Sequence, residues 1–113
     1  MTNGLRDRLV PGLWAGFYVQ CGHRYPQRLN LEFSDGIVRG DGVDGIGAFT
    51  VDGEYRIAAG DVRLGWIKTY DGGHSVLYLG ALEDNAIAGH WCFGCTPMDR
   101  FSLSPPEGGP RWR

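Results

Sequence analysis

The sequence predicts an all-β chain that closes as an antiparallel up-and-down eight-stranded β-barrel. Apolar and aromatic residues recur at every second position, which is the periodicity of a strand with one buried face. Turn signals separate these runs at regular spacing, and the dipeptide Asp-Gly alone occurs five times. No window longer than two turns carries the i, i+3, i+4, i+7 spacing of an amphipathic helix.

The alternation and the turn signals indicate eight short strands joined by tight links. The expected ranges are 12–20, 27–34, 36–41, 46–52, 61–70, 74–82, 86–93 and 99–104. An open meander would leave two bare edges, which closure removes, although an open sandwich or roll of the same strands is an alternative. We expect one barrel domain over 12–104, an N-terminal extension over 1–11 and a flexible Pro/Gly-rich tail over 105–113.

Glycine is the compositional outlier, with 19 of 113 residues against a usual share of about 7%. Five glycines follow aspartate, and each Asp-Gly pair suits a hairpin turn that needs positive φ. Another three, Gly16, Gly80 and Gly89, share a strand face with large aromatic residues. There they either relieve strand curvature or leave space for a ligand.

The bulkier strand face is expected to line the barrel interior. Its members are Trp14, Tyr18, Leu31, Phe33, Phe49, Trp66, Tyr70, Tyr78 and Trp91. The opposite face is mostly polar, but Phe17, Leu77 and Leu79 form an apolar patch there. Such a patch indicates self-association, so a homodimer is one expected partner.

Charge and hydropathy exclude several classes of function. Eleven basic and thirteen acidic residues, without a basic run, give no electrostatic footprint for nucleic acid. No apolar run approaches the 18 residues of a membrane-spanning helix, and residues 1–10 lack a signal-peptide core. We therefore expect a cytoplasmic protein with neither a membrane nor a nucleic-acid partner.

The barrel pattern resembles the calycin group, which includes lipocalins and avidin-type proteins. Gly12-Leu13-Trp14 on the first strand is similar to the lipocalin Gly-x-Trp motif, and the resemblance implies that Arg100 covers this tryptophan. The chain is shorter than a lipocalin and ends in Ser104-Pro105-Pro106 and a polar tail in place of a C-terminal helix. The resemblance implies binding inside the barrel and does not name the ligand.

Lys68 is the most informative polar residue. It is the only lysine, and it shares the parity of the apolar interior between Trp66 and Tyr70. A buried lysine costs several kcal/mol unless it is paired or loses its proton. Asp41, Asp44, Glu54 or a ligand carboxylate are candidate partners. Alternatively, Lys68 extends to water at the barrel rim or forms a structural ion pair.

Two further segments have the spacing of known metal or redox motifs, but ordinary turns explain them as well. Cys92 and Cys95 have Cys-x-x-Cys spacing. A redox pair is one alternative, but a strand follows them where a thioredoxin-like site has a helix. Zinc binding with His90, or with Cys21 and His23, is another, but no second Cys-x-x-Cys pair is present. The loop 41–45 lacks the ligands of an EF-hand. We therefore assign no metal and no cofactor.

These observations predict a protein that binds a small molecule or a peptide end in the interior or mouth of the barrel. The expected ligand is hydrophobic or aromatic. The candidate binding residues are Tyr18, Trp66, Lys68, Tyr70, Tyr78 and Trp91. A small cyclase or isomerase that uses Lys68, Tyr70 or Tyr78 is one alternative, and a homo-oligomeric interaction module is another.

Overall fold

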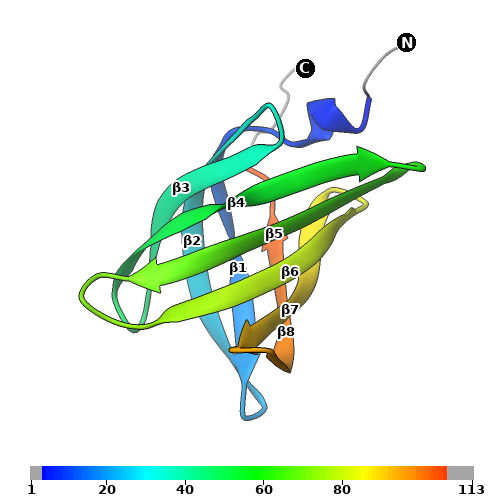
Figure 1. Cartoon of the computed structure of the whole chain (residues 1–113). Coiled ribbons are helices and arrows are strands. Elements are labelled where there is room, and N and C mark those ends of the chain that lie inside the picture. The colour runs from blue at the N-terminus through cyan, green and yellow to red at the C-terminus, as the bar shows by residue number, and fades with distance from the viewer. Residues whose placement is uncertain (1–3, 107–113) are drawn as a thin grey trace.

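The strands form one closed antiparallel barrel in the order β1 to β8, as seen in a computed structural model that describes residues 4–106 (Figure 1). Ala15–Tyr18 of the first strand pairs with Phe101–Ser104 of the last, and this pairing closes the barrel. The predicted fold class is thus confirmed. The elements are η1 (Arg6–Arg8), β1 (Gly12–Gln20), β2 (His23–Ser34), β3 (Ile37–Asp44), β4 (Ala48–Ala58), β5 (Asp61–Tyr70), β6 (Ser75–Glu83), β7 (Ala86–Phe93) and β8 (Thr96–Ser104).

Strands β1, β5 and β7 have the predicted bounds, and β6 is shifted by one residue. Strands β2, β3, β4 and β8 are longer than predicted. Strand β2 begins at His23, which pairs with Gln20, because the chain reverses within Cys21 and Gly22. Both turn residues have positive φ, 53° and 80°. The β1–β2 hairpin therefore continues beyond the segment in which apolar alternation is visible.

Two of the five Asp-Gly pairs are not turns, so that part of the prediction is wrong. Asp41-Gly42 lies within β3 and Asp52-Gly53 lies within β4. A Cβ at Gly42 would lie 2.2 Å from the carbonyl oxygen of Arg28 and 2.7 Å from the ring of Phe49, and one at Gly53 would lie 2.0 Å from the carbonyl oxygen of Gly65. These glycines allow a neighbouring strand to approach closely, and Gly42 also makes room for the Phe49 ring.

Gly16, Gly80 and Gly89 allow neighbouring strands to approach closely. A Cβ at Gly16 would lie 1.9 Å from the carbonyl oxygen of Ser102, and one at Gly89 would lie 2.0 Å from that of Leu79. At Gly80 the nearest atoms are the Ala88 carbonyl oxygen at 2.7 Å and the Phe101 ring at 3.0 Å. Neighbouring atoms occupy these sites, so the glycines do not leave space for a ligand, which was one of the two predicted roles.

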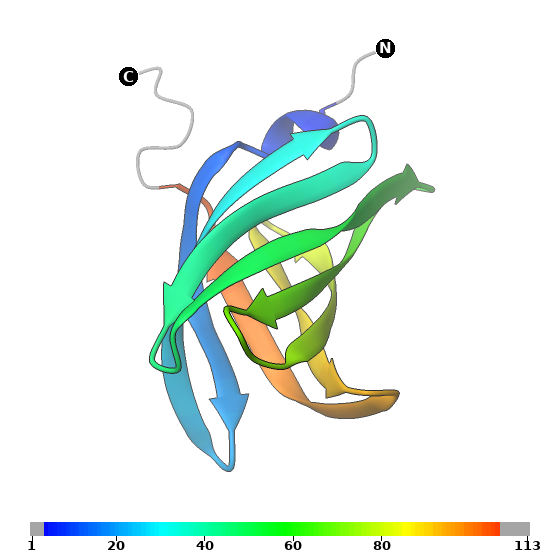
Figure 2. The ribbon, with the colours of Figure 1, turned by 60° about the vertical axis from the view of Figure 1, so that its left-hand side comes forward.

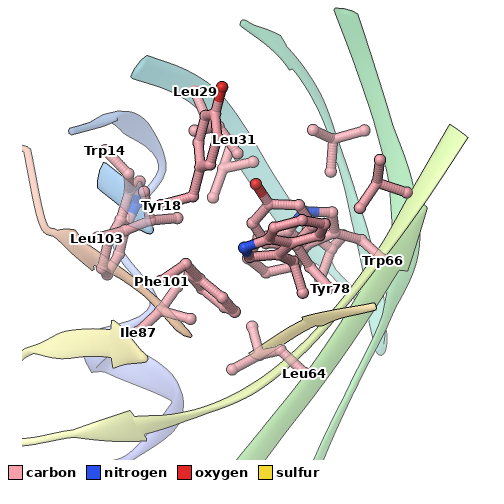
Figure 3. Close-up of a cluster of buried hydrophobic side chains, with 14 of the residues drawn as sticks. Trp14, Tyr18, Leu29, Leu31, Leu64, Trp66, Tyr78, Ile87, Phe101 and Leu103 are labelled. Atoms are coloured by element: carbon pink, nitrogen blue, oxygen red, sulfur yellow. The ribbon is translucent and has the colours of Figure 1, made fainter. Parts of the chain in front are cut away.

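The side chains that fill the barrel interior come from the strand face that the alternation predicts to be buried (Figure 3). Eight of the nine predicted interior residues are buried, and Phe33 is half-buried against the same cluster. Trp66 stacks on Tyr78 with ring centroids 5.7 Å apart and an interplanar angle of 12°. Phe101 packs against both rings.

The two ends of the barrel differ. Leu5 and Leu9, which flank η1, pack against the core, and Nε1 of Trp14 donates a hydrogen bond to the Val10 carbonyl at 2.8 Å. We call this the η1 end. The β1–β2 and β7–β8 turns lie at the opposite end, which we call the mouth (Figure 2).

Two predictions concern the ends of the sequence and the contact between Arg100 and Trp14. Residues 107–113 of the predicted tail and residues 1–3 of the predicted extension lie outside the described residues. Arg100 is exposed and pairs with His90 of β7. Ser104, four residues further along β8, is the residue that pairs with Ala15 beside the fully buried Trp14. Arg100 therefore does not cover Trp14 as the resemblance implies. Within residues 4–106, no helix has the length and apolar character required to cross a bilayer.

Candidate functional site

A pocket of about 300 Å³ opens at the mouth of the barrel. It lies where β1, β5 and β7 end and where β6 and β8 begin, and the loop between β3 and β4 borders it. Most of its exposed lining is apolar or aromatic. The lining residues are Tyr18, Gln20, Ile46, Tyr70, His74, Val76, Tyr78, Trp91, Phe93 and Met98.

The structure brings four of the six predicted binding residues to this pocket: Tyr18, Tyr70, Tyr78 and Trp91. Trp66 and Lys68 do not line it. Trp66 is 1% exposed and stacks on Tyr78 in the core, and Lys68 is fully buried. The alternation of residues along the strands identified the interior face correctly. It could not separate the residues that line the pocket from those buried beneath them.

Lys68 lies in a closed polar site among aromatic rings. Its Nζ donates hydrogen bonds to Oδ2 of Asp44 at 2.7 Å, to Oε1 of Gln27 at 2.9 Å and to the Tyr78 hydroxyl at 3.3 Å. It also lies 4.3 Å from the ring centroid of Phe49, within cation–π range. Because an ammonium group has three N–H donors, these partners use all of them.

Asp44, at the end of β3, is the counter-charge of Lys68. Both side chains of the pair are 0% exposed. Oδ2 of Asp44 also accepts a hydrogen bond from the Tyr70 hydroxyl at 2.6 Å. Oδ1 accepts from the backbone N–H of Ile46 at 2.8 Å and of Gly47 at 3.3 Å. Asp44 therefore links the loop at the mouth to the buried lysine.

The network shifts the pKa values of its members in ways that have clear causes. Burial lowers the pKa of Lys68, and the hydrogen bond and charge of Asp44 oppose that shift. Burial acts to raise the pKa of Asp44, but hydrogen bonds from Lys68 and Tyr70 outweigh it and the net pKa is lowered. We take the pair as ionised, since a 2.7 Å contact with three further donors on the carboxylate stabilises the charged form.

The three tyrosines of the pocket are neutral phenols. Burial, first of all, raises the pKa of Tyr18, Tyr70 and Tyr78, and the negative charge of Asp44 adds to the shift in each. Tyr70 also donates its proton to that carboxylate, which further disfavours ionisation. The pocket wall is thus polar but uncharged at these positions.

The aromatic walls are held in fixed orientations. Tyr18 meets Trp91 edge to face, with centroids 6.3 Å apart and an interplanar angle of 81°. Nε1 of Trp91 donates to the Val19 carbonyl at 2.8 Å, so that Trp91 offers the pocket only its ring. Tyr70 lies 5.0 Å from the exposed ring of His74. Contacts of this kind restrict the rotamers of the walls before any ligand arrives.

Sequence reasoning missed Gln27 and the rim of the pocket. Gln27 is 1% exposed and begins the inward alternation that continues with Leu29 and Leu31, so its parity was a usable signal. Ile46 lies in a loop and Met98 at the strand start, where alternation gives no guidance. Nε2 of Gln27 and Nε1 of Trp66 are buried without a hydrogen-bond partner among the described residues.

The cysteines take no part in this site. Cys92 is buried, and Cys21 and Cys95 are exposed; all three are free thiols. Among residues 4–106, no three His, Cys, Asp or Glu side chains gather closely enough to hold a metal ion.

Comparison of the chain with known protein families, curated protein sequences and solved structures found no match in any of the three.

Proposed function

We propose that the protein binds a small aromatic or hydrophobic molecule in the mouth of the barrel. The observation that carries this proposal is the 300 Å³ pocket, whose walls include Tyr18, Tyr70 and Trp91. Its volume is at the lower end of the range of about 300–1,000 Å³ for small-molecule sites. An apolar pocket with a few fixed polar groups is the usual form of such a site.

The buried network supports a pocket that persists without ligand. Asp44 holds the loop residue Ile46 at the rim, and Tyr70 is hydrogen-bonded to the same carboxylate. Pre-organised walls lower the free-energy cost of ordering side chains on binding. A carrier or binding module therefore fits this arrangement.

The cyclase or isomerase alternative is less well supported. Raised pKa values make Tyr70 and Tyr78 poor proton donors near neutral pH. Lys68 is fully buried and its three donors are occupied, so it has no hydrogen left for a substrate in the pocket. A loss of turnover with binding retained in Tyr70→Phe would favour the enzyme.

The homo-oligomeric alternative concerns the outer face. Leu79 is 48% exposed there, while Phe17 and Leu77 are half-buried. Arg24 already covers Phe17 with its guanidinium 4.2 Å from the ring centroid. Homodimerisation through these residues stays a prediction, and light scattering at high protein concentration tests it.

A calycin-type relationship and a cytoplasmic location also belong to the proposal. The closed eight-stranded barrel supports the former, as does burial of the Gly-x-Trp tryptophan, Trp14, at the start of β1. The absence of a membrane-spanning helix from residues 4–106 is compatible with the latter.

The test is an NMR titration with neutral ring compounds, namely benzyl alcohol, indole and 2-naphthol. We expect amide shifts confined to residues at the mouth. Ile46→Trp should weaken these shifts because a larger side chain at this rim position, 59% exposed, obstructs the pocket. The matched control Ile57→Trp, at an exposed site on β4 outside the pocket, should leave them unchanged. Equal effects of the two variants would contradict the proposal.

A further inference from the structure

We infer that the mouth pocket selects electrically neutral ring compounds and discriminates against carboxylates and amines of the same shape. This inference rests on the proposed function, because it specifies the ligand class of the same pocket. It concerns a property that the sequence left open, since a ligand carboxylate was one candidate partner for Lys68.

The charges behind the pocket are already balanced. Lys68 and Asp44 form a one-to-one pair at 2.7 Å with both side chains fully buried. None of the described residues that line the pocket is Asp, Glu, Lys or Arg. The imidazole of His74 lies at the rim and is exposed to water.

Both members of the pair are also saturated with hydrogen bonds. The three donors of Lys68 go to Asp44, Gln27 and Tyr78. Each carboxylate oxygen of Asp44 accepts two hydrogen bonds, from Lys68 and Tyr70 on one side and from backbone N–H groups on the other. A charged ligand group would therefore lose its water without gaining an ionic partner, which is unfavourable.

The hydroxyl groups at the wall suit an uncharged polar group. Tyr70 gives its proton to Asp44, so its oxygen is left as an acceptor. The oxygen of Tyr78 accepts from Lys68, so this phenol turns its polar end toward the buried pair. A neutral hydroxyl or amide on a ring compound can donate to the Tyr70 oxygen without bringing a charge into the pocket, whereas a carboxylate can only accept.

The experiment compares three ligands with the same ring system: 2-naphthol, 2-naphthoate and 2-naphthylmethylamine. Dissociation constants come from NMR titration at neutral pH, where the acid and the amine are charged. We expect 2-naphthol to bind at least about tenfold more tightly than either charged compound, because only the charged groups pay an uncompensated desolvation cost. Equal or tighter binding of 2-naphthoate or the amine would overturn the inference and leave the pocket proposal standing.

A different result would overturn the pocket proposal itself. If none of the three compounds shifts the amides at the mouth, the proposed function and the inference fail together.

Discussion

The η1 end and the mouth are built on the same eight strands, yet their interiors differ in chemistry. At the η1 end, the inward positions hold apolar residues such as Leu31, Val38 and Leu103, all 0% exposed. At the mouth, the same inward positions hold Lys68, Gln27 and a set of tyrosines around a pocket. Period-two alternation thus fixes which face is buried, and the residue types then decide whether that end is a packed core or a binding site.

Burying charged side chains at the mouth costs desolvation free energy. A buried ion pair is weak as a source of stability, since the desolvation of two charges offsets much of their attraction. Apolar residues of similar volume would satisfy the fold equally well, as they do at the η1 end. The presence of Lys68 and Asp44 at the mouth therefore agrees with a role in shaping the pocket.

The largest expected effect comes from breaking the buried pair. Lys68→Met leaves the carboxylate of Asp44 buried and unpaired, so we expect a loss of about 3–5 kcal/mol in the free energy of unfolding. Urea unfolding measures it. The double variant Lys68→Met/Asp44→Asn should be more stable than Lys68→Met, because the unpaired charge is gone. Arg39→Gln, in an exposed pair with Asp52 at 3.6 Å, should change stability by less than about 1 kcal/mol.

The next effect contrasts the packing of the two ends. Leu31→Ala removes a fully buried side chain at the η1 end and should cost about 3 kcal/mol. Val76→Ala, at the pocket, should cost about 1 kcal/mol, because part of the Val76 surface already borders open space. Thermal or urea unfolding of both variants checks the order. A larger loss for Val76→Ala would mean that the mouth is packed like the core.

A smaller effect is expected from the hydroxyl that joins the pocket wall to the ion pair. Tyr70→Phe removes a hydrogen bond to an ionised carboxylate and should cost about 1.5 kcal/mol, since Asp44 keeps its other three donors. Tyr25→Phe is the control, because its ring is 39% exposed and lies on the ring of Tyr18 at the outside of the mouth. A loss in Tyr25→Phe as large as in Tyr70→Phe would argue against the network.

The smallest expected effect is on the acid dependence of stability. The folded-state pKa of Asp44 is below 3.8, so its ionisation stabilises the fold above that pH. This stabilisation is lost as the pH falls through the folded-state pKa, with a slope of at most about 1.4 kcal/mol per pH unit. Wild-type protein should therefore lose more stability than Asp44→Asn between about pH 5 and pH 2. Parallel curves would show that Asp44 is not the group responsible.

Much of this arrangement can be predicted from the sequence, because alternation and the cost of burying a charge are local signals. They identify the interior face, and they require a partner for Lys68 without choosing among Asp41, Asp44 and Glu54. The choice depends on strand register: Asp44 ends β3 opposite Gln27, whereas Asp41 is exposed. The Asp-Gly pairs within β3 and β4 resemble turns in sequence, because a glycine required by the close approach of a neighbouring strand looks the same as a turn glycine.

The pocket itself is not a sequence-level property. It depends on the spacing of the strand ends around the mouth. Loop residues such as Ile46 follow no periodic pattern. Trp66 illustrates the same limit, since it shares its parity with Tyr70 but stacks on Tyr78 away from the pocket.

The most direct measurement is a crystal structure of the protein grown with 2-naphthol. We expect electron density for one ring compound in the mouth, in contact with Tyr18, Tyr70 and Trp91, and an unchanged Lys68–Asp44 pair behind it. Density at an outer surface instead, or a mouth filled by the side chains of Ile46 and Met98, would contradict it.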